Sequence, residues 1–386
     1  MQLYSHQKQM IAKAPKKYGL WWECGVGKTA TAIGLADKYN VKTVVVCPKS
    51  VKENWEREIV RFSLFPNNFK VITKETFRRD WESLSSEAII YDECHYVSSP
   101  TSQMFKNTLK YINKNKLKYT WLLSATPFRS EPFSIWCYAQ LFGYDWNYMR
   151  FREKYYYPMR MGRATIWKQR NNIEEDIKRM LESMGQFVEM RDCADIPPQI
   201  ELQPEIMELN ATQKKAIKEL DEVLPLPRIT AVHRIENETE GEKSARVIEL
   251  CEEHKKIIIV CRYNAQIELY KSLLELRAKK VFIINGEANN RQEIVDEMNT
   301  EDEAILLLQS DTSEGINLST VPVMVFASMS FSFLKYIQAK GRILRRNNLK
   351  KNIYYYLLTS GKSSDRLVYS AIMKGQNLED YIRDNL

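Results

Sequence analysis

Two series of apolar runs, one in each half of the chain, constrain the fold more than any other feature of this sequence. The first-half runs are TVVVC, FKVIT, EAIIYDE and YTWLLSAT, and the second-half runs are KKIIIVCR, KKVFIIN, AILLLQS and VPVMVFAS. Each run is bounded by polar or turn residues and alternates with helical stretches. Short apolar strands that alternate with helices are typical of a parallel sheet covered on both faces. The sequence therefore predicts an α/β fold with two units of similar plan.

The stretch between the two series has a different composition. Residues 144–170 are rich in Tyr, Trp, Arg and Lys and give no clear sheet signal, and an amphipathic helix is expected over 173–184. Pro197 and Pro198 then interrupt any helix, because proline has no amide hydrogen and restricts the residue before it. The expected organisation is a first lobe over 1–198, an aromatic and basic insertion within it at about 144–190, and a second lobe over 199–386.

The composition, with 44% hydrophobic and 27% charged residues, is typical of a soluble globular protein. No stretch resembles a signal peptide, and no apolar run reaches the roughly 18 residues that a membrane span needs. We therefore expect a cytoplasmic protein with no membrane partner. The seven cysteines show no C-x-x-C spacing, which favours buried free thiols and no metal other than a nucleotide-bound one. The net charge of +8 is only a weak indication of a polyanionic ligand.

The sharpest local motif is ECGVGKT, residues 23–29, which follows the apolar GLWW and precedes a predicted helix. A glycine-rich turn in this position presents backbone amides and a helix N-terminus to phosphate. Lys28 would contact the β- and γ-phosphates, and the Thr29 hydroxyl would bind Mg²⁺. Trp22 stands where the full phosphate-loop pattern has its first glycine. The residues expected at the nucleotide are Gly25, Val26, Gly27, Lys28 and Thr29.

An acidic pair ends the third apolar run, in IIYDECH, residues 89–95. Asp92 would hold Mg²⁺ through water, and Glu93 would orient and deprotonate the attacking water. The next run ends in LLSATP, where Ser124 and Thr126 could hydrogen-bond the acidic pair and transmit the nucleotide state. Taken alone, the acidic pair is equally consistent with a solvated loop, and the serine and threonine with a simple turn.

An arginine pair lies in YIQAKGRILRR, residues 336–346. Arg342 and Arg345 are three residues apart, so on a helix they would share a face. Two guanidinium groups directed at a γ-phosphate would stabilise the charge that develops during phosphoryl transfer. A basic, solvated helix face is the alternative for this segment taken alone.

These motifs follow one another in the order phosphate loop, acidic pair, Ser-Ala-Thr and arginine pair, with the arginines in the second unit. In this order the chain resembles the superfamily-two helicases over nearly its whole length, and within them the Swi/Snf-like translocases. The resemblance implies two tandem RecA-like lobes with the ATP site in the cleft between them. It also implies an ATP hydrolase that uses ATP and Mg²⁺.

Segments outside the ATPase motifs extend the resemblance. LYSHQKQMI is similar to the family's adenine-reading segment, which implies that Gln7 contacts the base. VVVCPKSVKENWEREI resembles the segment whose Pro-Lys turn, here Pro48 and Lys49, approaches the nucleic-acid backbone while its tryptophan packs structurally. DIPPQIELQPEIMELNATQKKAIKEL resembles the stretch that leads into the second lobe, a Pro-Pro followed by a strand and a helix.

QSDTSEGINLST resembles motif V, which implies that Gly315 and Asn317 lie at the interlobe face. Gly315 would then contact the nucleotide, while Asn317 and Gln338 would couple the nucleotide state to movement. The run SFSFLKYIQAKGRILRRN is most similar to Swi/Snf-like helicases common in bacterial viruses, for which the host-cell cytoplasm is the expected location.

The sequence also departs from the family pattern. The acidic box reads DECH where the family usually has DEAH, and Arg346, Asn347 and Asn348 follow Arg345 where the family often has a Gly-Gln pair. The chain has no room for accessory reader domains or for the long second-lobe insertions of chromatin remodellers. Only 19 residues separate Leu318 from Gln338, so a large strand-separating hairpin does not fit there, although a short one elsewhere is compatible.

The leading hypothesis is a DNA-stimulated ATPase, expected to be a monomer, that translocates on duplex or branched DNA and remodels forks or junctions. Nuclease, replication or recombination proteins are candidate partners. The insertion, with interleaved aromatic and basic residues, suits branched or partly single-stranded DNA, unless its aromatics pack against the first lobe. One alternative is an RNA helicase. Another is a nucleotide-gated DNA-binding module with little turnover that serves a nuclease or replisome.

Overall fold

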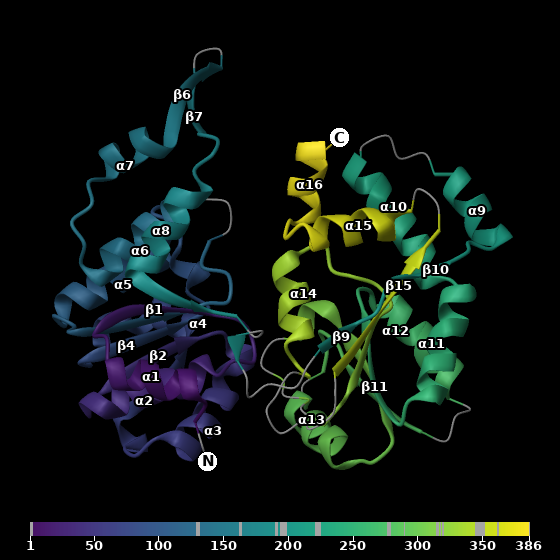
Figure 1. The fold of residues 1–386 in the computed structure, drawn as a ribbon, viewed down its shortest axis with the longest axis horizontal. Coiled ribbons are helices and arrows are strands. Elements are labelled where there is room, and N and C mark those ends of the chain that lie inside the picture. Colours follow the sequence, from purple (N-terminus) through teal and green to yellow (C-terminus); the bar gives the residue numbers. More distant parts are fainter. Residues whose placement is uncertain are drawn as a thin grey trace. The chain divides into compact units, whose positions relative to one another are not determined.

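The computed structural model of the 386-residue chain forms two compact units, Met1–Ala194 and Asp195–Leu386 (Figure 1). The lobe boundary was expected between residues 198 and 199. Residues 194–198 lie outside the described residues, so this boundary stays a prediction. The described residues are 3–128, 132–161, 164–189, 192–193, 199–220, 225–275, 279–288, 290–313, 316, 318, 320–343, 352–360 and 363–385.

The first unit is built on a parallel sheet with the strand order β3-β2-β4-β5-β1-β8. Its central strands are almost wholly buried, as a sheet covered on both faces requires. The strands are β1 (Lys17–Trp22), β2 (Thr43–Cys47), β3 (Phe69–Thr73), β4 (Ala88–Asp92), β5 (Tyr119–Leu123) and β8 (Gly185–Val188). Because all these pairings are parallel, the carboxyl ends of the strands lie along one edge of the sheet.

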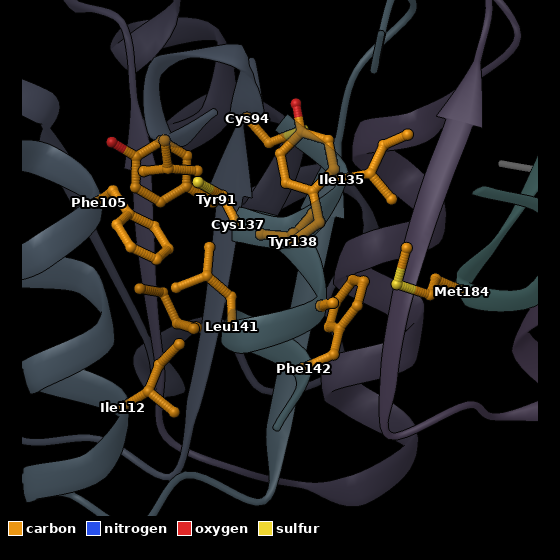
Figure 2. Close-up of a cluster of buried hydrophobic side chains, with 14 of the residues drawn as sticks. Tyr91, Cys94, Phe105, Ile112, Ile135, Cys137, Tyr138, Leu141, Phe142 and Met184 are labelled. Atoms are coloured by element: carbon orange, nitrogen blue, oxygen red, sulfur yellow. The ribbon is translucent and has the colours of Figure 1, made fainter. Parts of the chain in front are cut away.

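Helices pack on this sheet through a core rich in aromatic residues. Figure 2 shows part of it, with Tyr91 of β4, Phe105 of α5 and Tyr138 of α6 in one cluster. The helices are α1 (Ser5–Lys13), α2 (Lys28–Tyr39), α3 (Lys52–Phe62), α4 (Lys74–Asp80), α5 (Gln103–Lys114), α6 (Phe133–Phe142), α7 (Tyr148–Tyr155) and α8 (Glu174–Met184). Short 3-10 helices are η1 (Lys49–Val51), η2 (Pro66–Asn68), η3 (Trp81–Ser83) and η4 (Cys94–Val97).

Residues 144–170 of the insertion, whose sequence gave no clear sheet signal, contain two strands. After α7 the chain forms an antiparallel hairpin of β6 (Tyr156–Met161) and β7 (Ala164–Gln169). Tyr, Ile, Thr and Trp favour strands, and this preference was obscured by the interleaved arginines and lysines. Phe151, Tyr155 and Tyr156 are buried. These three aromatics therefore pack within the first unit, which was the alternative to their stacking on DNA bases.

The second unit repeats the plan, with the strand order β10-β15-β14-β11-β13-β12 and parallel pairings. β9 and β10 pair with successive parts of β15. The strands are β9 (Gln199–Glu201), β10 (Glu205–Met207), β11 (Lys256–Cys261), β12 (Lys280–Ile284), β13 (Ala304–Gln309), β14 (Val323–Phe326) and β15 (Asn352–Thr359). The eight apolar runs all form strands; β15, in NIYYYLLT, was not anticipated.

The helices of the second unit are α9 (Ala211–Lys218), α10 (Pro225–Glu238), α11 (Glu242–Glu253), α12 (Asn264–Leu274), α13 (Arg291–Thr300), α14 (Phe333–Lys340), α15 (Ser364–Met373) and α16 (Leu378–Asn385), with η6 at Ser310–Thr312. The seven cysteines are buried and form no disulfide within the described residues. Within the described parts of the chain, no helix has the length and apolar character needed to cross a membrane.

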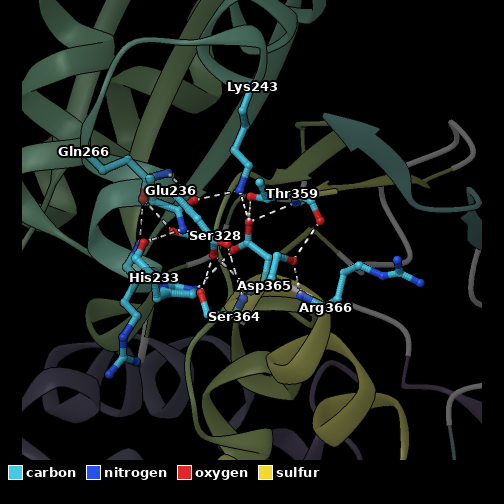
Figure 3. Close-up of polar contacts among 12 residues, drawn as sticks. His233, Glu236, Lys243, Gln266, Ser328, Thr359, Ser364, Asp365 and Arg366 are labelled. Carbon is cyan, nitrogen blue, oxygen red and sulfur yellow. Dashed lines mark hydrogen bonds and ion pairs between the residues drawn. The ribbon is translucent and has the colours of Figure 1, made fainter. Parts of the chain in front are cut away.

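A buried polar network joins α10, α11 and α15 in the second unit (Figure 3). Asp365 accepts hydrogen bonds from Lys243, from Asn237 Nδ2 at 3.1 Å and from the Thr359 amide at 3.1 Å. Burial alone would raise the pKa of Asp365, but the Lys243 ammonium and the His233 imidazole hold it below its usual value. Burial and the nearby Asp365 raise the pKa of Glu236 to about 7. The network fixes the packing of these helices, because a buried charge that loses its partner is costly.

Candidate nucleotide site

The loop between β1 and α2 has the backbone conformation that its glycines permit. β1 ends at Trp22, and α2 begins at Lys28, directly after the loop. Gly25 and Gly27 have φ angles of 87° and 89°, in the left-handed region where a side chain is disfavoured. The N-terminus of α2 therefore follows a tight turn at the end of a buried parallel strand, which is an arrangement suited to binding phosphate.

Side chains from α1 hold this loop. Gln7 is 3% exposed, and its Nε2 donates to the Gly27 carbonyl at 2.9 Å while its Oε1 accepts from the Tyr4 amide at 2.7 Å. His6 Nε2 lies 2.8 Å from the Val26 carbonyl oxygen. A Cβ on Gly27 would lie 2.0 Å from Gln7 Nε2, so contact with Gln7 is a second reason for glycine there. The expected contact of Gln7 with a base stays a prediction, and the role of His6 was not anticipated.

The Lys28 ammonium is held over the loop. Nζ donates to the carbonyls of Trp22 at 2.8 Å and Glu23 at 3.0 Å. It is also close enough to the end of β4 for its charge to lower the pKa of Asp92. Thr29, the next residue, is partly buried in the first turn of α2. Both residues therefore lie at the start of α2, beside the glycine-rich loop, and their contacts with phosphate and Mg²⁺ stay predictions.

The acidic pair lies at the carboxyl end of β4. Asp92 Oδ2 accepts from Trp55 Nε1 at 2.8 Å, and its Oδ1 accepts from the Glu93 amide at 3.0 Å. Burial and then the charge of Glu93 raise the pKa of Asp92 to about 6, against the opposing effects of Trp55 and Lys28. Two adjacent, partly buried carboxylates of this kind fit Mg²⁺, because its charge would offset their repulsion and it prefers oxygen ligands. Asp92 and the Thr29 hydroxyl are the residues suited to hold it.

Glu93 has an unusual backbone. Its φ and ψ angles are 53° and 57°, a left-handed conformation that is uncommon for residues other than glycine and is often found at functional sites. His95 Nδ1 lies 3.2 Å from Glu93 Oε2, and both side chains are largely buried. His95, for which the sequence suggested no role, is therefore a close neighbour of the Glu93 carboxylate.

The ends of β5 and β2 carry the other first-unit residues. Ser124 is fully buried and its Oγ accepts from the Thr126 amide at 3.1 Å. Thr126 Oγ1 is buried and has no hydrogen-bond partner among the described residues. Direct contact of these hydroxyls with the acidic pair stays a prediction. Pro48 is buried after β2, whereas Lys49 begins η1 and is exposed.

Trp55 connects two parts of the site. It lies on α3, which follows directly from η1, the 3-10 helix that begins with Lys49. Its side chain is fully buried, as a packing role requires, and it also donates to Asp92. A buried tryptophan normally needs an acceptor for its N–H, which is the only sequence signal that could have suggested this contact.

The second-unit residues are only partly described. α14 ends at Lys340, so Arg342 lies in the turn after the helix, and its expected common face with Arg345 stays a prediction because Arg345 lies outside the described residues. Gly341 at the helix C-cap explains the ending, because glycine disfavours helix. Arg342 Nε is buried and has no hydrogen-bond partner among the described residues. Gln338 is fully buried on α14. Gly315, Asn317 and Arg345 lie outside the described residues.

The first unit therefore brings the phosphate loop, the acidic pair, Ser124 and the Lys49 turn to the carboxyl ends of β1, β4, β5 and β2 in one sheet. In open parallel sheets this is the edge where ligands bind. Fold and site together define an α/β protein of two units, the first of which carries a glycine-rich loop suited to phosphate. The expected α/β fold class, with two units each built on a parallel sheet covered by helices, is confirmed by this architecture, and the ATP site expected between the two lobes stays a prediction.

Comparison with known proteins supports the motif resemblance. Residues 242–347 match the family model described as the helicase conserved C-terminal domain. The chain is 23% identical to the SWI/SNF-related matrix-associated actin-dependent regulator of chromatin subfamily A-like protein 1 of Drosophila melanogaster, over 89% of this chain and 50% of that protein. The chain thus spans about half the length of this curated relative.

Two solved structures are also similar. The Hef helicase domain of Pyrococcus furiosus has a TM-score of 0.59 and 14% identity, over 95% of this chain and 98% of that one. The SWI2/SNF2 ATPase core of Sulfolobus solfataricus, solved with double-stranded DNA, has a TM-score of 0.45 and 18% identity, over 97% and 91%. The family match and the curated relative support the resemblance to Swi/Snf-like superfamily-two helicases.

Proposed function

We propose that this chain is an ATP-dependent translocase that moves on duplex or branched DNA and remodels forks or junctions. The observation that carries the proposal is that residues suited to ATP hydrolysis and a residue suited to nucleic-acid binding lie at the same edge of one sheet. The phosphate loop and acidic pair would hydrolyse ATP, and Lys49, exposed at the end of the neighbouring β2, would contact a nucleic-acid backbone. Trp55 joins these two parts through its hydrogen bond to Asp92.

Different residues would bind the nucleotide, bind Mg²⁺ and activate water during hydrolysis. Lys28 and the N-terminus of α2 would bind the β- and γ-phosphates, and Gln7 the base. Asp92 would hold Mg²⁺, which when bound supplies charge stabilisation for the transferred phosphoryl group. Glu93, whose Oε2 lies 3.2 Å from His95 Nδ1, would accept the proton of the attacking water.

Arginines of the second unit would complete this chemistry. The buried Nε of Arg342 without a described partner is consistent with a guanidinium that serves an anionic ligand. Arg345 would stabilise the γ-phosphate in the transition state, as arginine fingers do. Gly315, Asn317 and Gln338 would couple the nucleotide state to movement of the lobes.

DNA is favoured over RNA by the resemblance of the Pro48–Lys49 segment and of the Pro-Pro stretch to Swi/Snf-like proteins. The curated relative is itself a regulator of chromatin. The arginine-rich run of the second unit supports a place among the Swi/Snf-like helicases common in bacterial viruses, with a role in DNA replication, repair or recombination. A monomer is sufficient for this mechanism.

The proposal is tested by steady-state ATPase assays with single-stranded, duplex, forked and four-way DNA and with RNA. We expect duplex or branched DNA to give the largest stimulation. The Lys28→Ala variant, purified in the same way, measures any contaminating ATPase. Stronger stimulation by RNA would replace the proposal with an RNA helicase. A slow rate unaffected by any nucleic acid would favour a nucleotide-gated binding module.

A further inference from the structure

The β6–β7 hairpin has an exposed face that the proposed ATPase mechanism does not use. Opposite residues of an antiparallel pair point to the same side, and Tyr157 is opposite Lys168 while Met159 is opposite Ile166. We propose that this outer face, formed by Tyr157, Met159, Ile166 and Lys168, contacts unstacked bases where a DNA duplex opens into single strands. The inference rests on the proposed function and names the DNA feature that the protein would read.

The other face of the hairpin anchors it to the first unit. Tyr156 is buried and stacks on Phe133 with ring centroids 4.8 Å apart. The Arg152 guanidinium lies over the Trp167 ring at 3.9 Å. An isolated two-stranded hairpin is marginally stable in water, so these contacts fix both its structure and its direction. Figure 1 shows the hairpin beyond α7, away from the parallel sheet of its own unit.

The outer face combines apolar and basic side chains in the open. Ile166 is 39% exposed, Tyr157 and Met159 are half-buried, and Lys168 is exposed. The Arg170 guanidinium lies 6.0 Å from the Tyr157 ring. Exposed apolar side chains on a hairpin with two unpaired edges favour aggregation unless a ligand covers them. The ligand must therefore cover an apolar surface.

Charge identifies that ligand as a polyanion. Residues 147–170 contain seven Arg or Lys residues and one Glu, a net charge of +6 out of +8 for the whole chain. Arg160 and Lys168 are exposed and form no ion pair within the part of the chain that the structure describes. A ligand that is both apolar and polyanionic matches a nucleic-acid strand, whose base faces stack on aromatics while its phosphates bind cations.

An opened duplex suits this face better than an intact one. In a continuous double helix the base faces are covered by their neighbours, and a protein meets mainly phosphates, sugars and groove edges. Tyr157, Met159 and Ile166 would gain little from such a surface. At a fork or junction the terminal base pairs and the emerging strands offer uncovered base faces, so binding there should exceed binding to blunt duplex.

The test compares a fork with a blunt duplex of the same sequence, using fluorescence anisotropy for affinity and 2-aminopurine at the junction to report stacking. The variant carries Tyr157→Ala and Ile166→Ala together. We expect its affinity for the fork to fall about tenfold, the scale of one lost base-aromatic stack, and the 2-aminopurine response to disappear. Affinity for blunt duplex should change less than about twofold, because phosphate contacts are kept.

Phe65→Ala is the matched control, since Phe65 is 40% exposed and lies outside the hairpin; it should change neither affinity. If the double variant does not fold, Ile166→Thr keeps a β-branched residue in the strand and should lose fork affinity by about threefold. Equal losses on fork and duplex, or no loss on either, overturn the inference while leaving the translocase intact. Failure of the unaltered protein to bind any DNA overturns the proposed function and the hairpin inference with it.

Discussion

Replacing Trp55 by phenylalanine removes one hydrogen bond from the candidate nucleotide site. Trp55 is fully buried and its Nε1 donates to Asp92 Oδ2 at 2.8 Å. Phenylalanine keeps much of the apolar packing but has no N–H. A hydrogen bond to an ionised group contributes about 1.5–3 kcal/mol, and about 1.4 kcal/mol corresponds to a tenfold change in proton affinity. Trp55→Phe should therefore favour the protonated form of Asp92 by about tenfold or more.

The sign of the effect on pH dependence follows from the folded site. Burial and Glu93 raise the pKa of Asp92 to about 6, and the Trp55 hydrogen bond acts in the lowering direction. Its removal moves the pKa further up. Because Mg²⁺ needs the ionised carboxylate, activity is lost as pH falls through this pKa. The acidic limb of the ATPase profile should thus move upward by about one pH unit or more.

The assay is kcat/KM for ATP against pH at subsaturating Mg²⁺, since this quantity reports groups of the free enzyme. We expect about a twofold loss at pH 7 that grows to about tenfold near pH 5, with recovery at higher pH or with excess Mg²⁺. Trp121→Phe is the matched control, because Trp121 is also fully buried but donates Nε1 to the Pro15 carbonyl at 2.9 Å. An unshifted profile in Trp55→Phe, or the same shift in Trp121→Phe, would refute the reasoning.

Four further predictions concern the proposed motor. Lys28→Ala should abolish hydrolysis without unfolding the chain, and near-normal turnover would remove the nucleotide assignment. Glu93→Gln should bind ATP and Mg²⁺ but hydrolyse about 10²–10⁴-fold more slowly; loss of ATP binding in a titration would make it a ligand instead. Lys49→Ala should weaken binding to all DNA sequences alike and reduce its salt dependence, against which a sequence-selective loss would count. Arg345→Ala should lose about 10³-fold or more of DNA-stimulated turnover and much less of the basal rate, and equal losses would exclude gating by lobe closure.

The sequence by itself determined the local elements of this protein. The helix predicted directly after the ECGVGKT motif is α2, Lys28–Tyr39, and Asp92 ends β4 as its apolar run indicated. These features depend on hydrophobic periodicity and on glycine at a tight turn, which are properties of neighbouring residues. The order of the strands along the chain, and hence a parallel sheet in each unit, followed from the same pattern.

Only the tertiary structure decided which distant residues meet. Trp55 and Asp92 are 37 positions apart, and Gln7 and Gly27 are 20 apart; strand order and helix packing bring them together, and no local pattern encodes that. α14 ends at Lys340 with Gly341 at its C-cap, so Arg342 lies in the following turn. The hairpin of the insertion depended on Tyr156 and Trp167 finding Phe133 and Arg152. Local preferences are weak, about 1 kcal/mol or less per residue, so long-range burial and hydrogen bonding determine the outcome wherever the local signal is mixed.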